Sequence, residues 1–379
     1  MIFTEHYLDN AATTKVCPEA AQAAMEAMTQ IYGNPSSTHT KGREAKHLLD
    51  RCRKQVADAL GCSASELFFT SCGSESDNWA LIAGAESMKR TGKHIISSSV
   101  EHDAIRKTLA KLEKMGYEVT TLSPDSSGAI SPEAVENALR EDTILVSLMM
   151  VNNETGGVTD IHAISEILRR KGSKALLHTD AVQAFMKVPF SAKKLGADMI
   201  SISGHKIHAP KGIGALYIKS GVKLKPFIEG GSQESGLRAG TEAMPQIAAF
   251  AEACSVATKG LAENCARMAS LKNYAIEKLS ENIPEFTYVR SDAPHILSIS
   301  LPGWRSEVLM NLLETKEVYV SKSSACKKGG RSHVLEAIGL KPEVIDGAIR
   351  VGLSRYTTQE DIDALVLGLT EARERLSHR

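Results

Sequence analysis

Two charged residues close short apolar stretches, where side chains of their type can do chemistry. Lys206 comes soon after the run "MISIS" at 199–203, and Asp180 ends the run "KALLHTD" at 174–180. Burial and neighbouring cations lower the pKa of a lysine and make its amine nucleophilic, while a buried aspartate needs a cation or good hydrogen bonds. Taken singly, a lysine that reaches solvent and an aspartate that caps the next helix are interpretations of at least equal weight.

The stretch "TSCGSES" at 70–76 has the composition of a loop that binds an anion. Its small residues let backbone amides approach a phosphate, and the helix-like "DNWALIAGAESM" that follows would present its N-terminus to negative charge. Ser74 in this loop, with Ser203 and His205 beside the lysine, could add donors. Alone, the stretch also fits an ordinary helix-capping loop. Combined with Lys206 and Asp180, it fits a site for pyridoxal 5'-phosphate, in which a lysine forms a Schiff base and an aspartate contacts the pyridine nitrogen.

Two further side chains suit sulfur or proton chemistry. Cys326 lies in "SKSSACKKGG" at 321–330, among serines, lysines and glycines, which indicates an exposed loop. The neighbouring Lys327 and Lys328 favour the thiolate, which is the reactive form. His102 follows the apolar run "HIISSSV" at 94–100. It could stack on a cofactor ring and carry protons, although a histidine at this place also fits a purely structural role.

The elements that must position these residues alternate between helix-like and strand-like stretches from about residue 20 to 220. Short apolar runs predict strands buried on both faces, as in a parallel α/β sheet. These runs are "ELFFTS", "HIISSSV", "TILVSLMMV", "KALLHTD", "DMISISG" and "GALYIK". Polar residues gather just after them, and ligands of open parallel sheets bind at the carboxyl ends of the strands. We therefore expect one shared site at that edge.

The last third of the chain has a different pattern, which predicts a smaller α+β domain. A long helix-like region at about 243–282 precedes the run "HILSISLPG", another helix, the Cys326 loop and a final helix "DIDALVLGLTEARERL". The stretch "TTQE" before that final helix has the pattern of a capping box. We predict a large domain at 15–255 and a small domain that combines 1–14 with 256–379.

Composition limits the possible function classes. The 379-residue chain is 42% hydrophobic and 24% charged, with 45 basic and 45 acidic residues. The zero net charge argues against direct nucleic-acid binding or a polybasic membrane protein. The sequence shows no export signal and no bilayer-spanning apolar stretch, so we expect a cytoplasmic protein with reduced thiols. Its seven cysteines lack a Cys-x-x-Cys spacing, so we expect no metal site.

A set of matching motifs extends over nearly the whole chain. They are "YLDNAATT" (7–14), "YGNPSSTH" (32–39), "FTSCGSESDN" (69–78), "EHDAI" (101–105), "VNNETGG" (151–157), "HTDAVQ" (178–183), "SISGHKIHAPKGIGALY" (201–217), "GGSQESGLRAGT" (230–241), "SSAC" (323–326) and "IRVGLSRYTTQEDID" (349–363). On these motifs the chain resembles the NifS/IscS-type cysteine desulfurases, which are class V aminotransferase-like proteins of pyridoxal phosphate fold type I. The resemblance implies a large domain with a mostly parallel, seven-stranded type of sheet flanked by helices, a smaller α+β C-terminal domain, and a homodimer.

The resemblance also implies a role for each matching residue around pyridoxal 5'-phosphate. Lys206 would hold the cofactor as a Schiff base, and Asp180 would keep the pyridine nitrogen protonated. Gln183 would bond the ring hydroxyl, and His102 would stack over the ring. Residues that would bind the phosphate share small or polar side chains; they are Gly73, Ser74, Ser203 and His205, with Thr241 reaching the cofactor of the other subunit.

On the substrate side, the resemblance implies that Asn153 and Arg350 hold the carboxylate of L-cysteine, with Asn34 nearby. Cys326 would attack the substrate sulfur and become a persulfide, and alanine would leave. The sulfur would pass to an acceptor protein for iron–sulfur cluster assembly or for thio-cofactor or tRNA synthesis. A selenocysteine lyase or a cysteine β-lyase on the same scaffold is an alternative, as is a sulfur-relay or scaffold-binding partner with low turnover.

Several positions depart from the family pattern. The family loop commonly reads Ser-Ser-Gly-Ser-Ala-Cys-Thr-Ser, whereas the loop around Cys326 is more basic and looks shorter. Ser235 stands where an arginine is usual and Ser232 where a glycine is usual, and Cys72 takes a common glycine position. These departures bear on the reach of Cys326 and on which acceptor docks.

Overall fold

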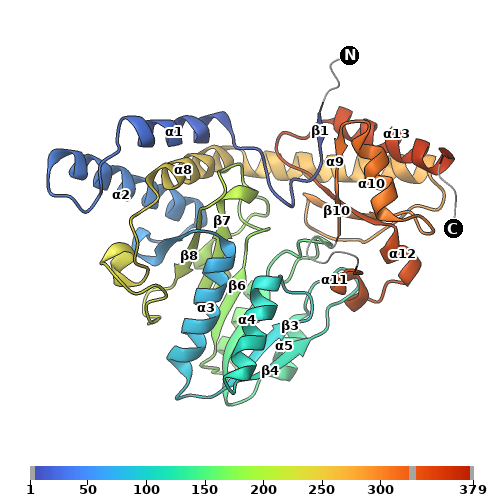
Figure 1. Cartoon of the computed structure of the whole chain (residues 1–379). Coiled ribbons are helices and arrows are strands. Elements are labelled where there is room, and N and C mark those ends of the chain that lie inside the picture. Colours follow the sequence, from blue (N-terminus) through green and yellow to red (C-terminus); the bar gives the residue numbers. More distant parts are fainter. Residues whose placement is uncertain (1–4, 324–329, 376–379) are drawn as a thin grey trace.

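The computed structural model describes residues 5–323 and 330–375, and a large sheet forms its centre (Figure 1). Strand β8 is antiparallel to both of its neighbours, and the other pairs are parallel. The predicted mostly parallel sheet is therefore confirmed. In spatial order this 7-stranded sheet consists of β2 (Leu67–Thr70), β8 (Gly214–Ile218), β7 (Met199–Ser203), β6 (Leu176–Asp180), β5 (Thr143–Met149), β3 (His94–Ser98) and β4 (Glu118–Leu122).

Side chains of the strands alternate between two cores, one on each face of the sheet. Phe68 and Ile95 pack with Trp79 in one core, whereas their neighbours Phe69 and Ile96 belong to a larger core on the other face. Both faces are apolar because helices cover both, as is usual for parallel strands. These helices are α1 (Pro18–Thr29), α2 (Thr40–Leu60), α3 (Gly73–Met88), α4 (Asp103–Lys114), α5 (Pro132–Ala138), α6 (Ile161–Arg170), α7 (Ala192–Leu195) and α8 (Met244–Lys259).

The C-terminal part of the chain has its own sheet and its own core. Its 4-stranded sheet is antiparallel, and a separate pair joins the N-terminal β1 to β11 in parallel. Leu8 from the N-terminus packs into this core with Leu297 and Ile349. In Figure 1 this part lies beside the large sheet, reached along the helix α9. Its elements are β9 (Thr287–Tyr288), β10 (Ile296–Ser300), β12 (Ser321–Lys322) and β13 (Ala348–Gly352), with β1 (His6–Tyr7), β11 (Val318–Tyr319), α9 (Leu261–Asn282), α10 (Ser306–Glu314), α11 (His333–Ala337), α12 (Pro342–Asp346) and α13 (Gln359–Arg375).

Three details differ from the sequence-based expectations. The expected helical region at 243–282 is divided, because α8 ends before Gly260 and α9 starts after it. The capping pair of α13 lies one residue later than "TTQE" suggests: the Thr358 amide donates to the Asp361 carboxylate, and the Asp361 amide donates to the Thr358 hydroxyl. Strand β4 was not among the predicted strands, because this edge strand carries mostly polar, partly exposed residues. No helix in the described ranges has the length and apolarity needed to cross a bilayer.

A buried ion pair fastens the loop at 229–243 to the large sheet. Arg53 on α2 donates to both carboxylate oxygens of Glu234 at 2.6 Å. The backbone amide of Phe69 in β2 donates to the same carboxylate at 2.9 Å. Glu234 is 7% exposed and its φ of 48° lies in the left-handed region, where non-glycine residues are strained. The ion pair therefore holds a strained loop in place.

We predict that Glu234→Gln lowers the free energy of unfolding by about 3 kcal/mol, because it leaves the charge of Arg53 without a counter-charge in a partly buried position. Urea denaturation of the two proteins measures the loss. Asp50→Asn is the control, since it removes the exposed Lys46–Asp50 pair and is expected to change stability little. Equal effects of the two substitutions would contradict the importance of the buried pair.

Candidate active site

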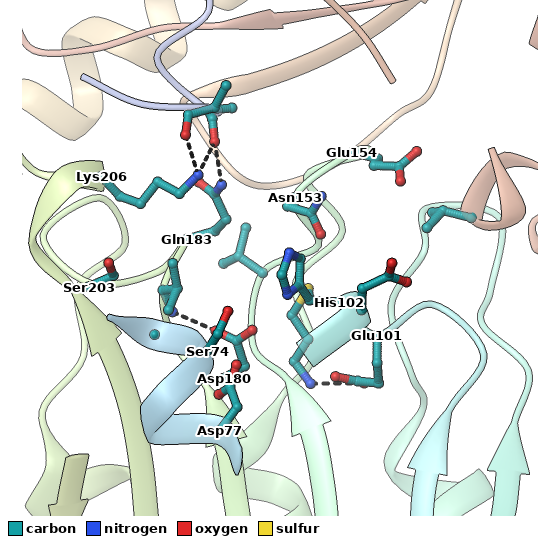
Figure 2. Close-up of a pocket in the computed structure, with 18 of the residues that line it drawn as sticks. Ser74, Asp77, Glu101, His102, Asn153, Glu154, Asp180, Gln183, Ser203 and Lys206 are labelled. Carbon is teal, nitrogen blue, oxygen red and sulfur yellow. Dashed lines mark hydrogen bonds between the residues drawn. The ribbon is translucent and has the colours of Figure 1, made fainter. Parts of the chain in front are cut away.

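A cavity of about 290 Å³ opens where the carboxyl ends of parallel strands meet the first turn of α3 (Figure 2). Side chains reach it from the ends of β3, β5, β6 and β7, and from β13 in the C-terminal sheet. Many of the residues singled out in the sequence line this one cavity: Gly73, Ser74, His102, Asn153, Asp180, Gln183, Ser203, His205, Lys206 and Arg350. The expected convergence of strand ends is thus present in the fold.

Lys206 lies at the end of a short 3-10 turn, η2 (Gly204–Lys206), directly after β7. Its Nζ donates to the backbone carbonyls of Ala11 at 2.8 Å and Ala12 at 2.6 Å (Figure 2). Burial and the charge of Arg350 lower the pKa of Lys206 to about 8, against opposing contributions from Asp9 and Asp180. A fraction of this amine is therefore unprotonated and nucleophilic at neutral pH.

Asp180 ends β6 on the floor of the cavity, close to a second carboxyl group from Asp77 in α3 (Figure 2). Its Oδ1 accepts the amide hydrogen of Val182 at 2.9 Å, in a run of turns rather than at the start of a helix. Burial raises the pKa of both carboxyls, and for Asp77 the charge of Asp180 raises it further. His102 and Lys206 lower the pKa of Asp180. The ionised form of Asp180 is therefore favoured by two cationic neighbours, whereas for Asp77 the charge of Asp180 adds to the effect of burial.

Glu101 is a third carboxyl at the cavity, and it is 1% exposed. Its Oε1 accepts hydrogen bonds from the Ser98 hydroxyl at 2.6 Å and from the Met149 amide at 3.0 Å, while Oε2 has no partner within the described residues. Burial raises the pKa of Glu101 to about 8. The group is therefore protonated at neutral pH, so the neighbouring Asp180 does not face another anion from β3.

The corner of the cavity beside α3 has the features of an anion site. The hydroxyl of Ser203 is buried and has no hydrogen-bond partner within the described ranges. Gly73 begins α3, and a Cβ at this position would lie 2.7 Å from Val182 and 3.6 Å from the Cβ of Ser203. Glycine therefore leaves open a space that faces an unpaired donor at a helix N-terminus, an arrangement that suits phosphate.

Arg350 enters the cavity from the C-terminal sheet and is 3% exposed. One of its terminal nitrogens donates to the Asn153 carbonyl at 2.8 Å, and the other donates to the Ser321 hydroxyl at 2.8 Å and lies 3.3 Å from Asp9. Its Nε has no partner among the described atoms. A buried guanidinium with one free donor is suited to a carboxylate ligand.

Two further ionisable groups of the cavity have shifted pKa values, one lowered and one raised. His205 contacts the Thr13 hydroxyl at 3.2 Å, and burial lowers the pKa of this imidazole to about 4. Burial raises the pKa of Glu154 to about 7, and its carboxylate accepts a hydrogen bond from Ser332. His102 begins α4 as its N-cap, accepting the Ala104 amide at 3.2 Å through Nδ1. The residue also lines the cavity.

Three predicted residues do not line this cavity in the described part of the chain. Asn34 is exposed before α2, and its side-chain oxygen accepts the Ser36 amide at 2.9 Å. Thr241 is exposed in the loop that Glu234 fastens. Cys326 lies outside the described residues.

Sequence reasoning missed the roles of several residues that the structure places in or behind the cavity. Asp77 and Glu101 were recognisable only as polar residues near strand ends. Lys187 is 5% exposed and contacts Gln183 from behind. The available signal for Lys187 was a lysine between apolar residues in "AFMKVPF". Within the ranges 5–323 and 330–375, no cluster of three or more His, Cys, Asp and Glu residues could hold a metal ion.

Comparisons of sequence and of structure with known proteins both indicate one family for this chain. Residues 6–365 match the family described as aminotransferase class-V. The chain is 42% identical over 376 residues to "Cysteine desulfurase IscS" of Methanosarcina thermophila, covering 98% of this chain and 92% of that protein. It is 43% identical over 375 residues to "Cysteine desulfurase 2" of Trichormus variabilis, covering 98% and 93%. The chain belongs to the class V aminotransferase family.

Solved structures place this class V aminotransferase among the NifS-like proteins. A structure titled "NIFS-LIKE PROTEIN" superposes with a TM-score of 0.93 at 37% identity, covering 98% of this chain and 100% of that one. A NifS-like protein from Rickettsia africae gives a TM-score of 0.88 at 30% identity, covering 98% and 100%. The resemblance to NifS/IscS-type proteins and the α/β fold expected from the sequence are thus confirmed.

The raised pKa of Glu101 predicts a pH-dependent contribution to stability. The carboxyl titrates near 4.5 when unfolded and at about 8 when folded, so the folded protein holds an extra proton between these values. The unfolding free energy therefore falls as pH rises through this window, by at most about 1.4 kcal/mol per pH unit. Glu101→Gln cannot titrate, so its stability relative to wild type should rise steadily from pH 5 to pH 8 in urea denaturation.

The control is Glu113→Gln, which changes an exposed glutamate of α4 and should show no such trend. A constant difference between Glu101→Gln and wild type across the window would show that Glu101 is already ionised at pH 5 in the folded protein.

Proposed function

We propose that this protein is a pyridoxal phosphate-dependent cysteine desulfurase, which converts L-cysteine to L-alanine and passes the sulfur to an acceptor. The observation that carries the proposal is the cavity in which the Lys206 amine, the Asp180 carboxylate and the unpaired Ser203 hydroxyl meet. Relatives that are over 40% identical along nearly the whole chain are named cysteine desulfurases, which supports the same activity here.

The residues of the cavity fit pyridoxal 5'-phosphate. Its phosphate suits the corner formed by Gly73, Ser74, Ser203 and His205, where the buried Ser203 hydroxyl has no partner among the residues that the structure describes. Asp180 offers a carboxylate for the pyridine nitrogen, and Gln183 and His102 line the space between this carboxylate and the mouth. Lys206 would hold the cofactor covalently through its amine. When bound, the cofactor withdraws electrons from the Cα of the amino acid attached to it.

The chain's own residues bind the substrate and move its protons. The free Nε of Arg350, together with Asn153, would hold the substrate carboxylate, with Asn34 contributing from outside the cavity. Lys206, once released from the cofactor, has a pKa suited to moving a proton at the substrate Cα near neutral pH. His102 lines the cavity and would carry a second proton.

Cys326 would take the sulfur. Its thiolate attacks the substrate sulfur, a sulfur–sulfur bond forms, and the carbon–sulfur bond breaks with its electron pair left on the substrate Cβ. A proton then converts that carbon to the methyl group of alanine. The persulfide would pass its outer sulfur to an acceptor protein, such as an iron–sulfur scaffold or a thiolation enzyme.

A homodimer and a division into domains complete the proposal. Thr241 is exposed and away from the cavity of its own chain, as expected of a residue that serves the cofactor of a partner subunit. We also propose the boundaries 15–255 for the large domain, with 1–14 joined to 256–379 in the small one. The packing of Leu8 with α9, β10 and β13 supports this joining of the two ends.

Lys206→Ala should abolish covalent attachment of the cofactor and lower activity at least 100-fold, because general acid–base catalysis by a positioned residue contributes about that much or more. Reduction with borohydride followed by peptide mass spectrometry measures the attachment directly. Wild type should carry the added mass on the peptide containing Lys206. Retention of that mass on another lysine in the variant would overturn the assignment.

Cys326→Ala should keep cofactor attachment and L-cysteine binding but lose transfer of labelled sulfur. Sulfur-35 on the protein and alanine in solution are the two measurements. Cys62→Ala, which removes a buried thiol of the main core, is the matched control and should transfer sulfur normally. Full sulfide release by Cys326→Ala would favour a β-lyase. Equal use of selenocysteine by the wild-type protein would favour a selenocysteine lyase. A wild-type protein that forms no alanine would favour a sulfur-relay partner.

A further inference from the structure

Lys187 is a lysine buried directly behind the active site. It is 5% exposed and lies in the run of turns that follows β6. Within the described part of the chain, none of the ion pairs includes its amine, and its Nζ donates to the side-chain oxygen of Gln183 at 3.3 Å. A buried lysine is costly to keep unless its amine has a task, so this position calls for an explanation.

The contact continues into the active site through Gln183. The Nε2 of Gln183 donates to the Ala11 carbonyl at 2.8 Å, and Lys206 donates to the same carbonyl at 2.8 Å (Figure 2). Which way an amide group points is decided by its partners. Here the amine of Lys187 meets the amide oxygen and a carbonyl meets the amide nitrogen, so both contacts fix the same orientation. The N–H₂ of Gln183 therefore faces the side where Lys206 lies.

The surroundings of Lys187 are cationic. The charges of Lys206 in η2 and Arg350 in β13 both lower the pKa of its amine. The charge of Lys187 in turn lowers the pKa of three histidines, which lie in the turn after β7 and in the segment before β10: His205, His208 and His295. Burial, followed by the charges of Lys206 and Arg350, holds the pKa of Lys187 well below its usual range. Lys187 also lines a cavity of about 20 Å³ together with Lys206. The amine is thus a buried donor close to Lys206, in surroundings that disfavour its charged form.

We propose that Lys187 is a positioning residue, whose amine holds the Gln183 amide so that its N–H₂ is directed at the cofactor ring hydroxyl. The proposal rests on the proposed function, because it concerns the same cofactor. A methionine in place of Lys187 would fill the same space at a lower desolvation cost. It would leave the side-chain oxygen of Gln183 without the Lys187 donor, so the Gln183 amide group could rotate. An N–H donor stabilises the anionic form of a ring oxygen, which lowers the pKa of the neighbouring nitrogen that links the cofactor to Lys206.

The test is a pH titration of the visible absorbance of the purified holoprotein. Lys187→Met should raise the midpoint of this titration by about one pH unit, and it should weaken retention of pyridoxal 5'-phosphate about tenfold. Gln183→Met should raise the midpoint similarly, and Lys187→Met in the Gln183→Met background should add nothing. That non-additivity is expected only if Lys187 acts through Gln183.

Lys272→Met is the matched control. Lys272 is equally buried, at 7% exposed, and its amine donates to Ser291 and to the Ala293 carbonyl, away from Gln183. This variant should lose thermal stability but keep the wild-type midpoint. If Lys187→Met does not fold, Lys187→Gln takes its place, since it keeps an N–H donor with a shorter reach and should raise the midpoint by a smaller amount.

An unchanged midpoint in the Lys187 variant, an additive double variant, or an equal shift in Lys272→Met would each overturn the positioning role while leaving the proposed function intact. Wild-type protein that binds no pyridoxal 5'-phosphate, as judged by its absorbance, would overturn both.

Discussion

The candidate active site depends on a buried lysine whose amine donates to two backbone carbonyls. Lys206 has Ala11 and Ala12 as its acceptors, and it takes no part in any side-chain ion pair of the described chain. Carbonyl acceptors satisfy the amine without fixing its positive charge as a carboxylate would, so burial is free to lower its pKa. A carboxylate in place of these carbonyls would raise the pKa again and remove the nucleophile. The position of residues 11 and 12 is therefore the constraint on which the chemistry depends.

That constraint explains why the N-terminal segment runs between the two sheets. Asn10 donates from its side chain to the Gly352 carbonyl at the end of β13, and Thr14 donates to the His205 carbonyl beside Lys206. At Gly352 a Cβ would lie 2.4 Å from the Ala11 amide nitrogen, so glycine is required for this close approach. The segment is fastened at one end to the C-terminal sheet and at the other to the turn that contains Lys206. Arg350 in β13 and Lys206 after β7 are brought to one cavity by this shared attachment.

Much of the fold and of the site could be predicted from the sequence, because both have local signals. Buried strands appear in the sequence as apolar runs. The residues that follow these strands are polar because they line the cavity. Strand β4 lacked that signal, since it lies at the sheet edge and is partly exposed. The protonated Glu101 and the buried Lys187 could not be foreseen, because the pKa of a group depends on which atoms surround it in three dimensions. The apolar neighbours of Lys187 in "AFMKVPF" indicate burial, but they do not indicate which groups its amine contacts.

The departure at Cys72 is tolerated for a reason that the backbone makes plain. This residue precedes α3 with a φ of -175°, which is extended backbone open to any residue, so the glycine usual in the family is not needed for its conformation. The restriction falls instead on its neighbours. A Cβ added at Gly73 would lie 2.7 Å from the side chain of Val182. A Cβ added at Gly214 on β8 would lie 2.8 Å from the carbonyl carbon of Cys72. Variation is thus allowed where a side chain has room, and it is excluded where a Cβ would meet Val182 or the backbone of Cys72.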